Sequence, residues 1–502
     1  MSKWQEDLAD VRAIHENALR FNRMSFEELK AHIEAHPEDR GLHHINLPEG
    51  GHLRISANST NRFLALTKRL IAVAPSNTDL DLATLNRAIR EQFVEMFLLK
   101  QRKIERSSVD KMLAHALKRV RTKHRSVTHY LPCILVGDHP PLEITLGPVR
   151  FLHESKFFEY FGSKIDSDQH AESTRRRATA EQMLADGQIR ELISRDDWEE
   201  LDRKLLQRVP EYYKPYKWVA EIKVPPCDDR ISRTRAELAV QAALDVLKLF
   251  AFGWRFGCRV HLGAGHGIID SVTDVVQNEE GRFAITWSRG VQWALADDGW
   301  FDELQKGAAG YLGAAAQLIE AYVSPVRPFE IATRWLDALN WYGQAVEERV
   351  PSAQIVKYVA ALERLTITEE TPTDDDRGLT SAVTRRSALF AAGTDDAARM
   401  ERLLEARDLY RRRSKLMHGQ QSPISKEQGV SDQNRSLMAK ADDLTRHVLI
   451  GALNEYVQLL TNGKTTDADL EERLRILEVA FFEVSPDEPI TPIASPPAVS
   501  RE

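Results

Sequence analysis

Side chains that can move a proton and stabilise negative charge lie close together between residues 409 and 419, where the sequence is Leu-Tyr-Arg-Arg-Arg-Ser-Lys-Leu-Met-His-Gly. Histidine titrates near neutral pH, so His418 can serve as a general acid or base. Arginine stays charged, so Arg413 can stabilise charge that develops on a phosphorus atom through paired hydrogen bonds. These two residue types supply what a phosphoryl-transfer site needs.

The same residues also fit an ordinary helix end. Basic side chains favour the negative C-terminal end of a helix dipole, and Gly419 is a natural residue for the first position beyond the helix. On this interpretation His418 is only a cation at a helix end. An isolated Arg-x4-His spacing matches many chains by accident, so the surrounding segments must decide.

Helix geometry sets a condition on the catalytic interpretation. Five residues advance an α-helix by ~500°, so Arg413 and His418 lie ~140° apart around its axis. Two copies of the helix would bring the groups together, which makes dimerisation part of the mechanism. Two further arginines precede His418 at wider spacings: five residues separate Arg412 from His418, and six separate Arg411 from it.

The segments around this motif occur in a characteristic order. They are Ala361-Leu-Glu363-x-Leu365, an acidic loop, Thr384-Arg-Arg-Ser-Ala-Leu389, and then Tyr410 followed by Arg413-Ser414-x-x-x-His418-Gly419. This order resembles the Apea-like branch of the HEPN superfamily over residues 324 to 462, about the last third of the chain. The resemblance implies a metal-independent endoribonuclease without a cofactor, which acts as a homodimer and cleaves RNA by attack of the 2′-hydroxyl. Arg413 and His418 of the two copies would line one cleft.

The resemblance also implies supporting roles for Tyr410, Arg412 and Ser414. Many active HEPN nucleases carry Asn, Asp or His where this chain has Ser414, although serine still donates and accepts a hydrogen bond. We expect Glu363 either to pair with a motif arginine across the bundle or to be an exposed helix residue. The family suggests anti-phage or abortive-infection defence in a prokaryote, with tRNA among the targets. The alternative is a catalytically inactive bundle that serves as an RNA-binding or protein-interaction module.

A second basic feature lies between residues 100 and 125. Ten Lys and Arg residues stand there against Glu105 and Asp110, a net charge of +8. Such a run can bind a phosphate backbone without sequence selectivity, although solvated helix faces have the same composition. The candidate RNA-binding residues are Lys100, Arg102, Lys103, Arg106, Lys118, Arg119 and Arg121.

The hydrophobic pattern predicts an α+β fold that is predominantly helical, with a mixed α/β region followed by an all-α HEPN-type bundle. We predict a helical region over residues 1–125, a mixed α/β sensor or substrate-positioning region over 126–298, a bundle over 299–465 and a C-terminal extension over 466–502, disordered from about 485. Strands are expected at 127–136, 142–152, 217–224, 258–262 and 283–287, with a hairpin loop at 278–281. Helices are expected at 80–99, 170–194, 230–250, 329–349, 355–365, 395–417 and 437–460.

Composition bounds the class of protein. The 502 residues are 42% hydrophobic and 28% charged, which excludes a wholly disordered or fibrous chain. The net charge of -7 gives no overall sign of a nucleic-acid binder, so RNA contact must be local. Three scattered cysteines support neither a disulfide framework nor a zinc site. No export signal or membrane span is visible, so we predict a cytoplasmic protein without membrane contact.

Three weaker features favour structural interpretations. The pair His261 and His266 lacks a usual ligand spacing, and the glycines between them lack the rest of a phosphate-loop motif. Glu221-Ile-Lys223 matches half of a restriction-type metal site, but no acidic strand precedes it. Trp335 and Trp341 lie on an amphipathic helix and favour packing over base stacking.

Overall fold

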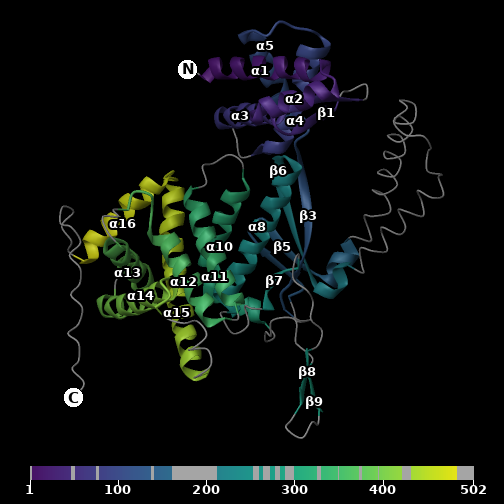
Figure 1. Cartoon of the computed structure of the whole chain (residues 1–502). Helices are drawn as coiled ribbons and strands as arrows, with labels where there is room; N and C mark the ends of the chain where they lie inside the picture. Colours follow the sequence, from purple (N-terminus) through teal and green to yellow (C-terminus); the bar gives the residue numbers. More distant parts are fainter. Residues whose placement is uncertain are drawn as a thin grey trace. The chain divides into compact units, whose positions relative to one another are not determined.

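The structure, a computed structural model, describes the chain in a series of ranges (Figure 1). These are residues 3–46, 51–74, 79–136, 141–160, 212–252, 259–263, 272–277, 283–288, 299–324, 330–348, 350–371, 376–393, 395–420 and 431–482. The chain divides into two compact units. Unit 1 contains residues 1–127, 224–235 and 324–326, and unit 2 contains residues 128–223, 236–323 and 327–502.

Unit 1 is mainly helical and has its own hydrophobic core. Its elements are α1 (Lys3–Arg23), α2 (Phe26–Ala35), the 3-10 helix η1 (Pro37–Asp39), β1 (Leu42–Asn46), β2 (His52–Ser56), α3 (Ala57–Val73), α4 (Leu82–Phe93), the π-helix η3 (Val94–Leu99) and α5 (Arg106–Arg121). The amphipathic helix α4 contributes Leu85, Ile89 and Phe93 to a core that also contains Phe63 and Met112. The helix predicted over residues 80–99 is confirmed, with a π-helical second part.

Unit 1 also contains a hairpin that the prediction of helix alone for residues 1–125 missed. Strands β1 and β2 pair antiparallel, with Leu42 opposite Ser56 and Asn46 opposite His52. Each strand is only five residues long. In β1, His43 and His44 separate the apolar residues Leu42 and Ile45, so the alternation is broken, and β2 has only two alternating apolar residues. The hairpin therefore forms through its contacts with the rest of unit 1 rather than through a strong local pattern.

The mixed α/β part of unit 2 is built on a five-stranded sheet in the order β4-β5-β6-β3-β7. Its strands are β3 (Arg125–Ile134), β4 (Glu143–Leu146), β5 (Val149–His153), β6 (Trp218–Cys227) and β7 (His261–Leu262), and β3 and β6 extend into unit 1 at one end. A separate hairpin joins β8 (Val272–Gln277) to β9 (Phe283–Ser288). The predicted loop at 278–281 and helix at 170–194 lie outside the described residues.

The prediction of one strand over residues 142–152 is wrong, because the structure has two. Strands β4 and β5 pair antiparallel, with Glu143 opposite Leu152 and Leu146 opposite Val149. The turn between them contains Gly147, whose φ of +56° favours glycine. A Cβ atom at Gly147 would also lie 3.0 Å from the carbonyl oxygen of Ala316. A backbone requirement at one residue therefore divides a strand-like stretch of sequence into the two strands of a hairpin.

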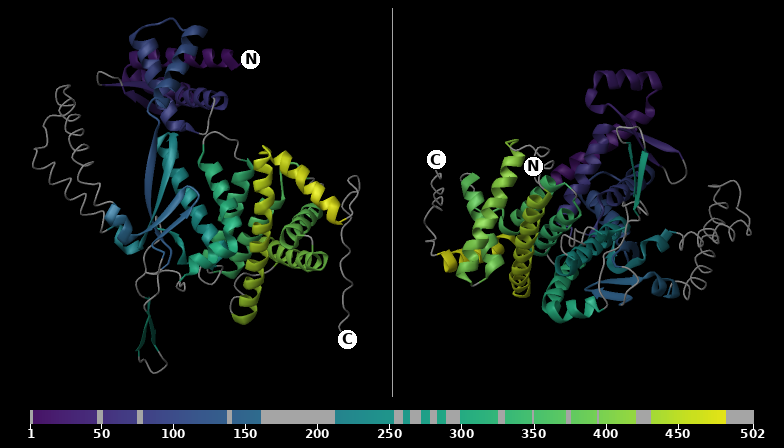
Figure 2. Two further views of the ribbon diagram at one scale, coloured as in Figure 1. Left: turned by 180° about the vertical axis from the view of Figure 1, so that it is seen from behind. Right: turned by 90° about the horizontal axis from the view of Figure 1, so that it is seen from below.

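The remainder of unit 2 is helical (Figures 1 and 2). Its helices are α8 (Asp229–Leu247, of which 229–235 belong to unit 1), the π-helix η5 (Lys248–Phe252), α10 (Trp300–Val323), α11 (Glu330–Glu347), α12 (Pro351–Thr366), α13 (Asp376–Ala392), α14 (Asp396–Met417), α15 (Ser431–Thr461) and α16 (Asp467–Phe482). The helices predicted at 230–250, 329–349, 355–365, 395–417 and 437–460 are confirmed. The side chains of Trp335, Tyr342, Tyr358 and Tyr456 are fully buried in this part.

Buried polar contacts fix the bundle helices against one another. Asp442 of α15 accepts hydrogen bonds from the hydroxyl groups of Tyr342 in α11 (3.0 Å) and Tyr358 in α12 (3.4 Å). Gly451 of α15 lies so close to Phe390 of α13 that a Cβ atom would overlap the Phe390 carbonyl oxygen. These contacts hold α12, α13 and α15 in register, and α12 and α13 both contact the motif helix α14.

Helix α16, in the predicted C-terminal extension, packs into the bundle. Arg386 of α13 is buried and forms ion pairs with Glu471 (2.7 Å) and Glu478 (3.2 Å) of α16. Arg334 of α11 also pairs with Asp467 at the start of α16. The described part of the extension is therefore structurally continuous with the bundle. The tail predicted to be disordered from about 485 lies outside the described residues.

These elements confirm the predicted fold class, which is α+β and predominantly helical. The mixed α/β part and the bundle together form unit 2, and the boundary of unit 1 at 127 lies near the predicted boundary at 125. A HEPN-type bundle stays a prediction.

Candidate functional site

The Arg-x4-His motif lies at the C-terminal end of α14. The side chain of Asp395 caps the N-terminus of this helix by accepting a hydrogen bond from the backbone of Ala398 (3.0 Å). At the other end Gly419 has a φ of +66°, and its N–H and that of Gln420 donate to helix carbonyl groups at 3.2 and 2.9 Å. This pair of bonds is a Schellman motif, in which His418 is the C-cap residue that follows Met417, the last residue of the helix. The expectation of a helix end at this position is confirmed, and the side chain of His418 is exposed.

Arg413 contacts the neighbouring helix. Its Nη2 atom lies 3.3 Å from Oε2 of Glu363 in α12, and the two side chains are 28% and 26% exposed. Glu363 therefore pairs with a motif arginine across the bundle instead of lying fully exposed. The Nε atom of Arg413 is buried and has no hydrogen-bond partner among the described residues. This donor is shielded from solvent, so a ligand can reach only the exposed part of the Arg413 side chain.

Tyr410 completes a three-residue cluster, which we call the Arg413 cluster, with Glu363 and Arg413. The Cζ atom of Arg413 lies 5.8 Å from the centre of the Tyr410 ring. Burial raises the pKa of the Tyr410 hydroxyl, and the carboxylate of Glu363 raises that pKa further. The hydroxyl therefore stays protonated at neutral pH and can donate a hydrogen bond to Glu363. Thr380 of α13, which the sequence interpretation did not single out, is another hydrogen-bond partner of Tyr410.

Other motif residues lie outside this cluster. Arg412 pairs with Asp408 of the same helix at 2.8 Å, as residues one turn apart commonly do. Ser414 is half-buried, and its carbonyl group accepts a hydrogen bond from the backbone of His418 at 3.0 Å. One copy of the chain therefore joins Arg413 to Glu363 and Tyr410, while His418 stands at the exposed end of the helix.

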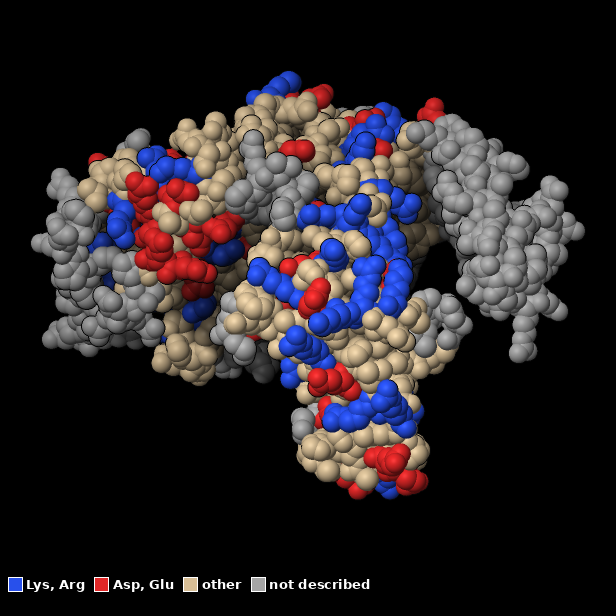
Figure 3. Space-filling model, turned by 90° about the horizontal axis from the view of Figure 1, so that it is seen from above, with Lys and Arg blue, Asp and Glu red and all other residues tan. Residues whose placement is uncertain are grey.

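The basic segment at 100–125 contains α5, which has one apolar face and one basic face. Val109, Met112, Leu113, Ala116 and Val120 are buried in the core of unit 1. Three candidate residues make local contacts: Lys100 pairs with Glu95 (2.6 Å), Arg119 with Glu91 (2.9 Å), and Arg106 with Asp110 (3.8 Å). Arg102, Lys103 and Lys118 are exposed, and Arg121 is half-buried. Figure 3 shows a band of Lys and Arg side chains on the face seen from above.

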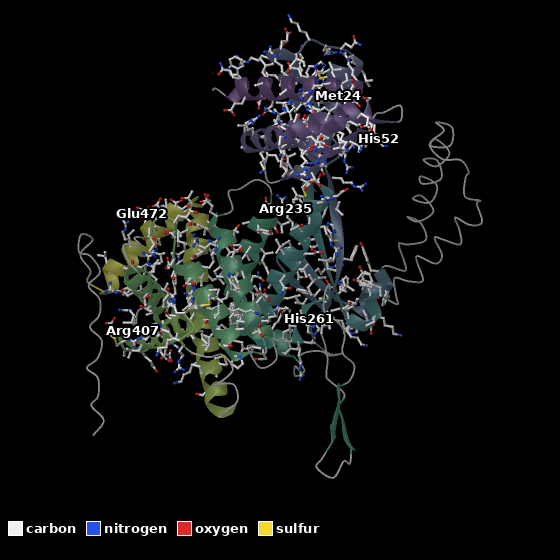
Figure 4. The ribbon with its side chains drawn as sticks, in the orientation of Figure 1. Met24, His52, Arg235, His261, Arg407 and Glu472 are labelled. Atoms are coloured by element: carbon white, nitrogen blue, oxygen red, sulfur yellow. The ribbon has the colours of Figure 1, made fainter. Side chains whose placement is uncertain are left out.

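The weaker candidates are engaged in structural contacts. Glu221 accepts a hydrogen bond from the hydroxyl of Tyr130 (3.2 Å) and pairs with Arg150 (2.7 Å). His261 lies on β7 (Figure 4), and its Nδ1 atom is 3.3 Å from the carbonyl oxygen of Leu262. His266 lies outside the described residues. Trp335 is fully buried and donates a hydrogen bond to the carbonyl of Leu449 (3.1 Å), as the packing interpretation predicts, whereas Trp341 is 39% exposed and is not packed in the core.

A search of the described ranges finds no group of three or more His, Cys, Asp or Glu side chains arranged to hold a metal ion. None of the helices in those ranges is both long and apolar enough to cross a membrane. Comparison with protein-family models, curated proteins and solved structures finds no match for this chain. Its function must therefore be argued from its own residues.

Proposed function

We propose that this protein is a metal-independent endoribonuclease of the HEPN type that acts as a homodimer. The observation that carries the proposal is the Arg413 cluster beside a helix end that presents His418 to solvent. The cluster holds a permanently charged guanidinium group on a side chain that is 28% exposed. The exposed histidine is accessible to a ligand as large as RNA.

The chemistry follows from these side chains. His418 takes the proton from a ribose 2′-hydroxyl, and the 2′-oxygen attacks the adjacent phosphorus atom. The bond to the 5′-oxygen breaks, a proton goes to that oxygen, and the products are a 2′,3′-cyclic phosphate and a 5′-hydroxyl end. Arg413 stabilises the charge on the phosphorane, and Glu363 holds the guanidinium in place. Because Arg413 and His418 lie ~140° apart on one helix, a second copy brings one residue of each kind to the same phosphate.

Unit 1 supplies the RNA contact in this proposal. The exposed basic face of α5 can replace counterions along a phosphate backbone, which gives affinity without sequence selectivity. The resemblance to the Apea-like branch extends the proposal to a cytoplasmic role in prokaryotic anti-phage or abortive-infection defence, with tRNA as a target.

The ion pair itself supports a second candidate. Glu363 occupies one edge of the Arg413 guanidinium, and Ser414 replaces the Asn, Asp or His of many active relatives. A bundle in which Glu363 never releases that edge would bind RNA or another protein without cleaving RNA.

Cleavage of purified tRNA and total RNA in the presence of EDTA distinguishes the two candidates. An active nuclease cuts in the chelator, loses activity in His418→Ala and in Arg413→Ala, and leaves 2′,3′-cyclic phosphate ends. The matched controls His447→Ala and Lys415→Ala each remove a side chain of similar chemistry from an exposed or half-exposed position. RNA binding without cleavage supports the inactive module, and equal cutting by the motif variants and the controls excludes this site.

A further inference from the structure

Unit 1 contains a pocket of about 360 Å³ that neither the motif nor the basic segment predicted. The pocket is lined by residues of α4, by the end of α5 and the residues that follow it, and by the first turn of α8. All of these residues belong to unit 1. The volume lies within the range of small-molecule and nucleotide sites in proteins.

Three cations on the wall of this pocket are available to a ligand. They are Arg87 of α4, Lys123 just after the end of α5, and Arg230 of α8. All three line the pocket and are exposed. None of them has an ion-pair partner in the part of the chain that the structure describes. They come from three separate stretches of sequence, so the fold gathers them around one space. An arginine in this position can bind an anion through two parallel hydrogen bonds.

The acidic residues of the wall offset these cations only in part. Glu91 pairs with Arg119, which also lines the pocket, at 2.9 Å. Asp228 accepts a hydrogen bond from the backbone N–H of Arg230 (3.1 Å), which stabilises the beginning of α8. Asp229 is the one acidic wall residue whose side chain has no ion pair or hydrogen bond within the described ranges. The available charge in the pocket is therefore positive and favours an anion.

A buried histidine in the same wall lacks a hydrogen-bond partner. The side chain of His124 is 7% exposed, and its Nδ1 atom lies 3.9 Å from Oδ2 of Asp79. Its Nε2 atom is buried and has no partner among the described residues. A buried polar atom without a partner costs free energy, so a ligand oxygen that accepts from Nε2 would be stabilising. With Nδ1 facing Asp79, Nε2 is the ring nitrogen left for a ligand.

A nucleophilic role for this pocket is not supported. Cys227 also lines it, but the residue is buried, and burial raises the pKa of its thiol. The thiol therefore stays protonated and is a poor nucleophile. The features that remain are three available cations and one unpartnered imidazole nitrogen, and these are the groups that recognise a phosphate.

We propose that this pocket binds a phosphate group through Arg87, Lys123, Arg230 and His124. The phosphate is carried either by an RNA end or by a free nucleotide. The exposed cations of α5, among them Lys118, lie on the helix that leads into the pocket, so a phosphorylated RNA end is the source we expect. The site lies in a different unit from the Arg413 cluster, and its binding does not depend on cleavage.

Binding measurements on the full chain test the proposal. The probes are inorganic phosphate, AMP, and one single-stranded RNA with either a 5′-phosphate or a 5′-hydroxyl, all tested in a His418→Ala background that keeps the RNA intact. We expect saturable binding of the phosphate-bearing probes. Arg87→Gln, Arg230→Gln and Lys123→Gln each weaken it about tenfold, because a hydrogen bond to a charged group is lost. Lys68→Gln removes an exposed lysine of α3 and serves as the matched control.

The relative affinities of the probes identify the source of the phosphate. A tighter complex with 5′-phosphate RNA than with 5′-hydroxyl RNA or AMP identifies an RNA end, whereas AMP binding as tightly as the phosphorylated RNA identifies a free nucleotide. Absence of saturable binding, or equal binding by the pocket variants and Lys68→Gln, overturns the proposal. His124→Leu distinguishes a ligand contact from a structural role: it should lose phosphate affinity while keeping the thermal unfolding temperature of the parent. These readouts are unaffected if the RNA cleavage proposal fails.

Discussion

The guanidinium of Arg413 and the carboxylate of Glu363 join α14 to α12 through a contact of 3.3 Å between Nη2 and Oε2. The arginine of the motif is therefore held by the bundle, whereas His418 follows the last turn of α14 and is exposed. In the proposed reaction, Arg413, which would stabilise charge, is therefore fixed in position, and His418, which would move the proton, is accessible to the RNA.

Glu363→Gln should slow RNA cleavage without unfolding the protein. The amide cannot hold the guanidinium as an ion pair, so we expect a loss of about tenfold in the single-turnover rate. Both side chains are more than a quarter exposed, so the free energy of unfolding should fall by no more than about 1 kcal/mol. Glu401→Gln changes an exposed residue of α14 and provides the control. A fall in rate explained entirely by unfolded protein in a urea titration would contradict the positioning role.

Gly419→Ala should destabilise the end of α14 that places His418. The φ of +66° at Gly419 is unfavourable for alanine, and we expect a loss of about 1 kcal/mol in the free energy of unfolding. Gly310→Ala is a control of opposite sign, because this glycine lies within α10 and an added Cβ atom meets nothing within 4 Å. Alanine should stabilise that helix by about 0.4–1 kcal/mol. Urea unfolding measures both, and equal effects of the two substitutions would contradict the assignment.

The sequence predicted the helices of unit 2 because apolar residues recur at helical spacing. In α15, Leu444, Val448, Ala452 and Tyr456 are all fully or almost fully buried, as their spacing indicates. The β1–β2 hairpin was missed because His43 and His44 interrupt the alternation in β1 and because β2 has only two alternating apolar residues, Leu53 and Ile55. The break at Gly147 was missed although Gly147-Pro148 is a local turn signal. The close approach of Ala316 in α10 to Gly147 is visible only in the structure.

Some residues of the candidate site could be predicted from the sequence, and others could not. Pairing of Glu363 with a motif arginine was one of two alternatives, because a buried carboxylate needs a cation. The structure selects this alternative and shows that Arg413 is the partner. Thr380 gave no signal, since a single threonine on a helix has no distinctive spacing. The pocket proposed to bind phosphate gave a partial signal, because Lys123 belongs to the basic run at 100–125. Arg87 and Arg230 are far apart in sequence and resemble any exposed arginines. Long-range geometry, rather than residue type, decides such sites.

Arg386→Met should release α16 from the bundle. The substitution removes the guanidinium that pairs with Glu471 and Glu478 and leaves buried carboxylates without a cation. We expect the free energy of unfolding to fall by about 3–5 kcal/mol. Arg364→Met breaks the more exposed pair with Asp337 and should cost no more than about 1 kcal/mol. Chemical denaturation compares the two, and a smaller loss in Arg386→Met than in Arg364→Met would exclude a stabilising role for this buried network.

The buried carboxyl group of Asp245 should give the stability of unit 2 a specific pH dependence. Burial raises the pKa of Asp245 from 3.8 to about 6. The ammonium group of Lys248, 2.7 Å away, lowers this pKa, and the carboxylate of Glu347, which pairs with the same ammonium group, raises it. A group with a raised folded-state pKa contributes stability that is complete below its unfolded pKa and is lost as the pH rises through its folded pKa. We therefore expect the free energy of unfolding of the wild type, relative to Asp245→Asn, to fall between about pH 4 and pH 6 and then to remain level. Urea titrations at closely spaced pH values measure this difference, and Asp302→Asn at an exposed position should show no such fall. A difference that increases with pH across this range would show that Lys248 lowers the pKa of Asp245 more than burial raises it.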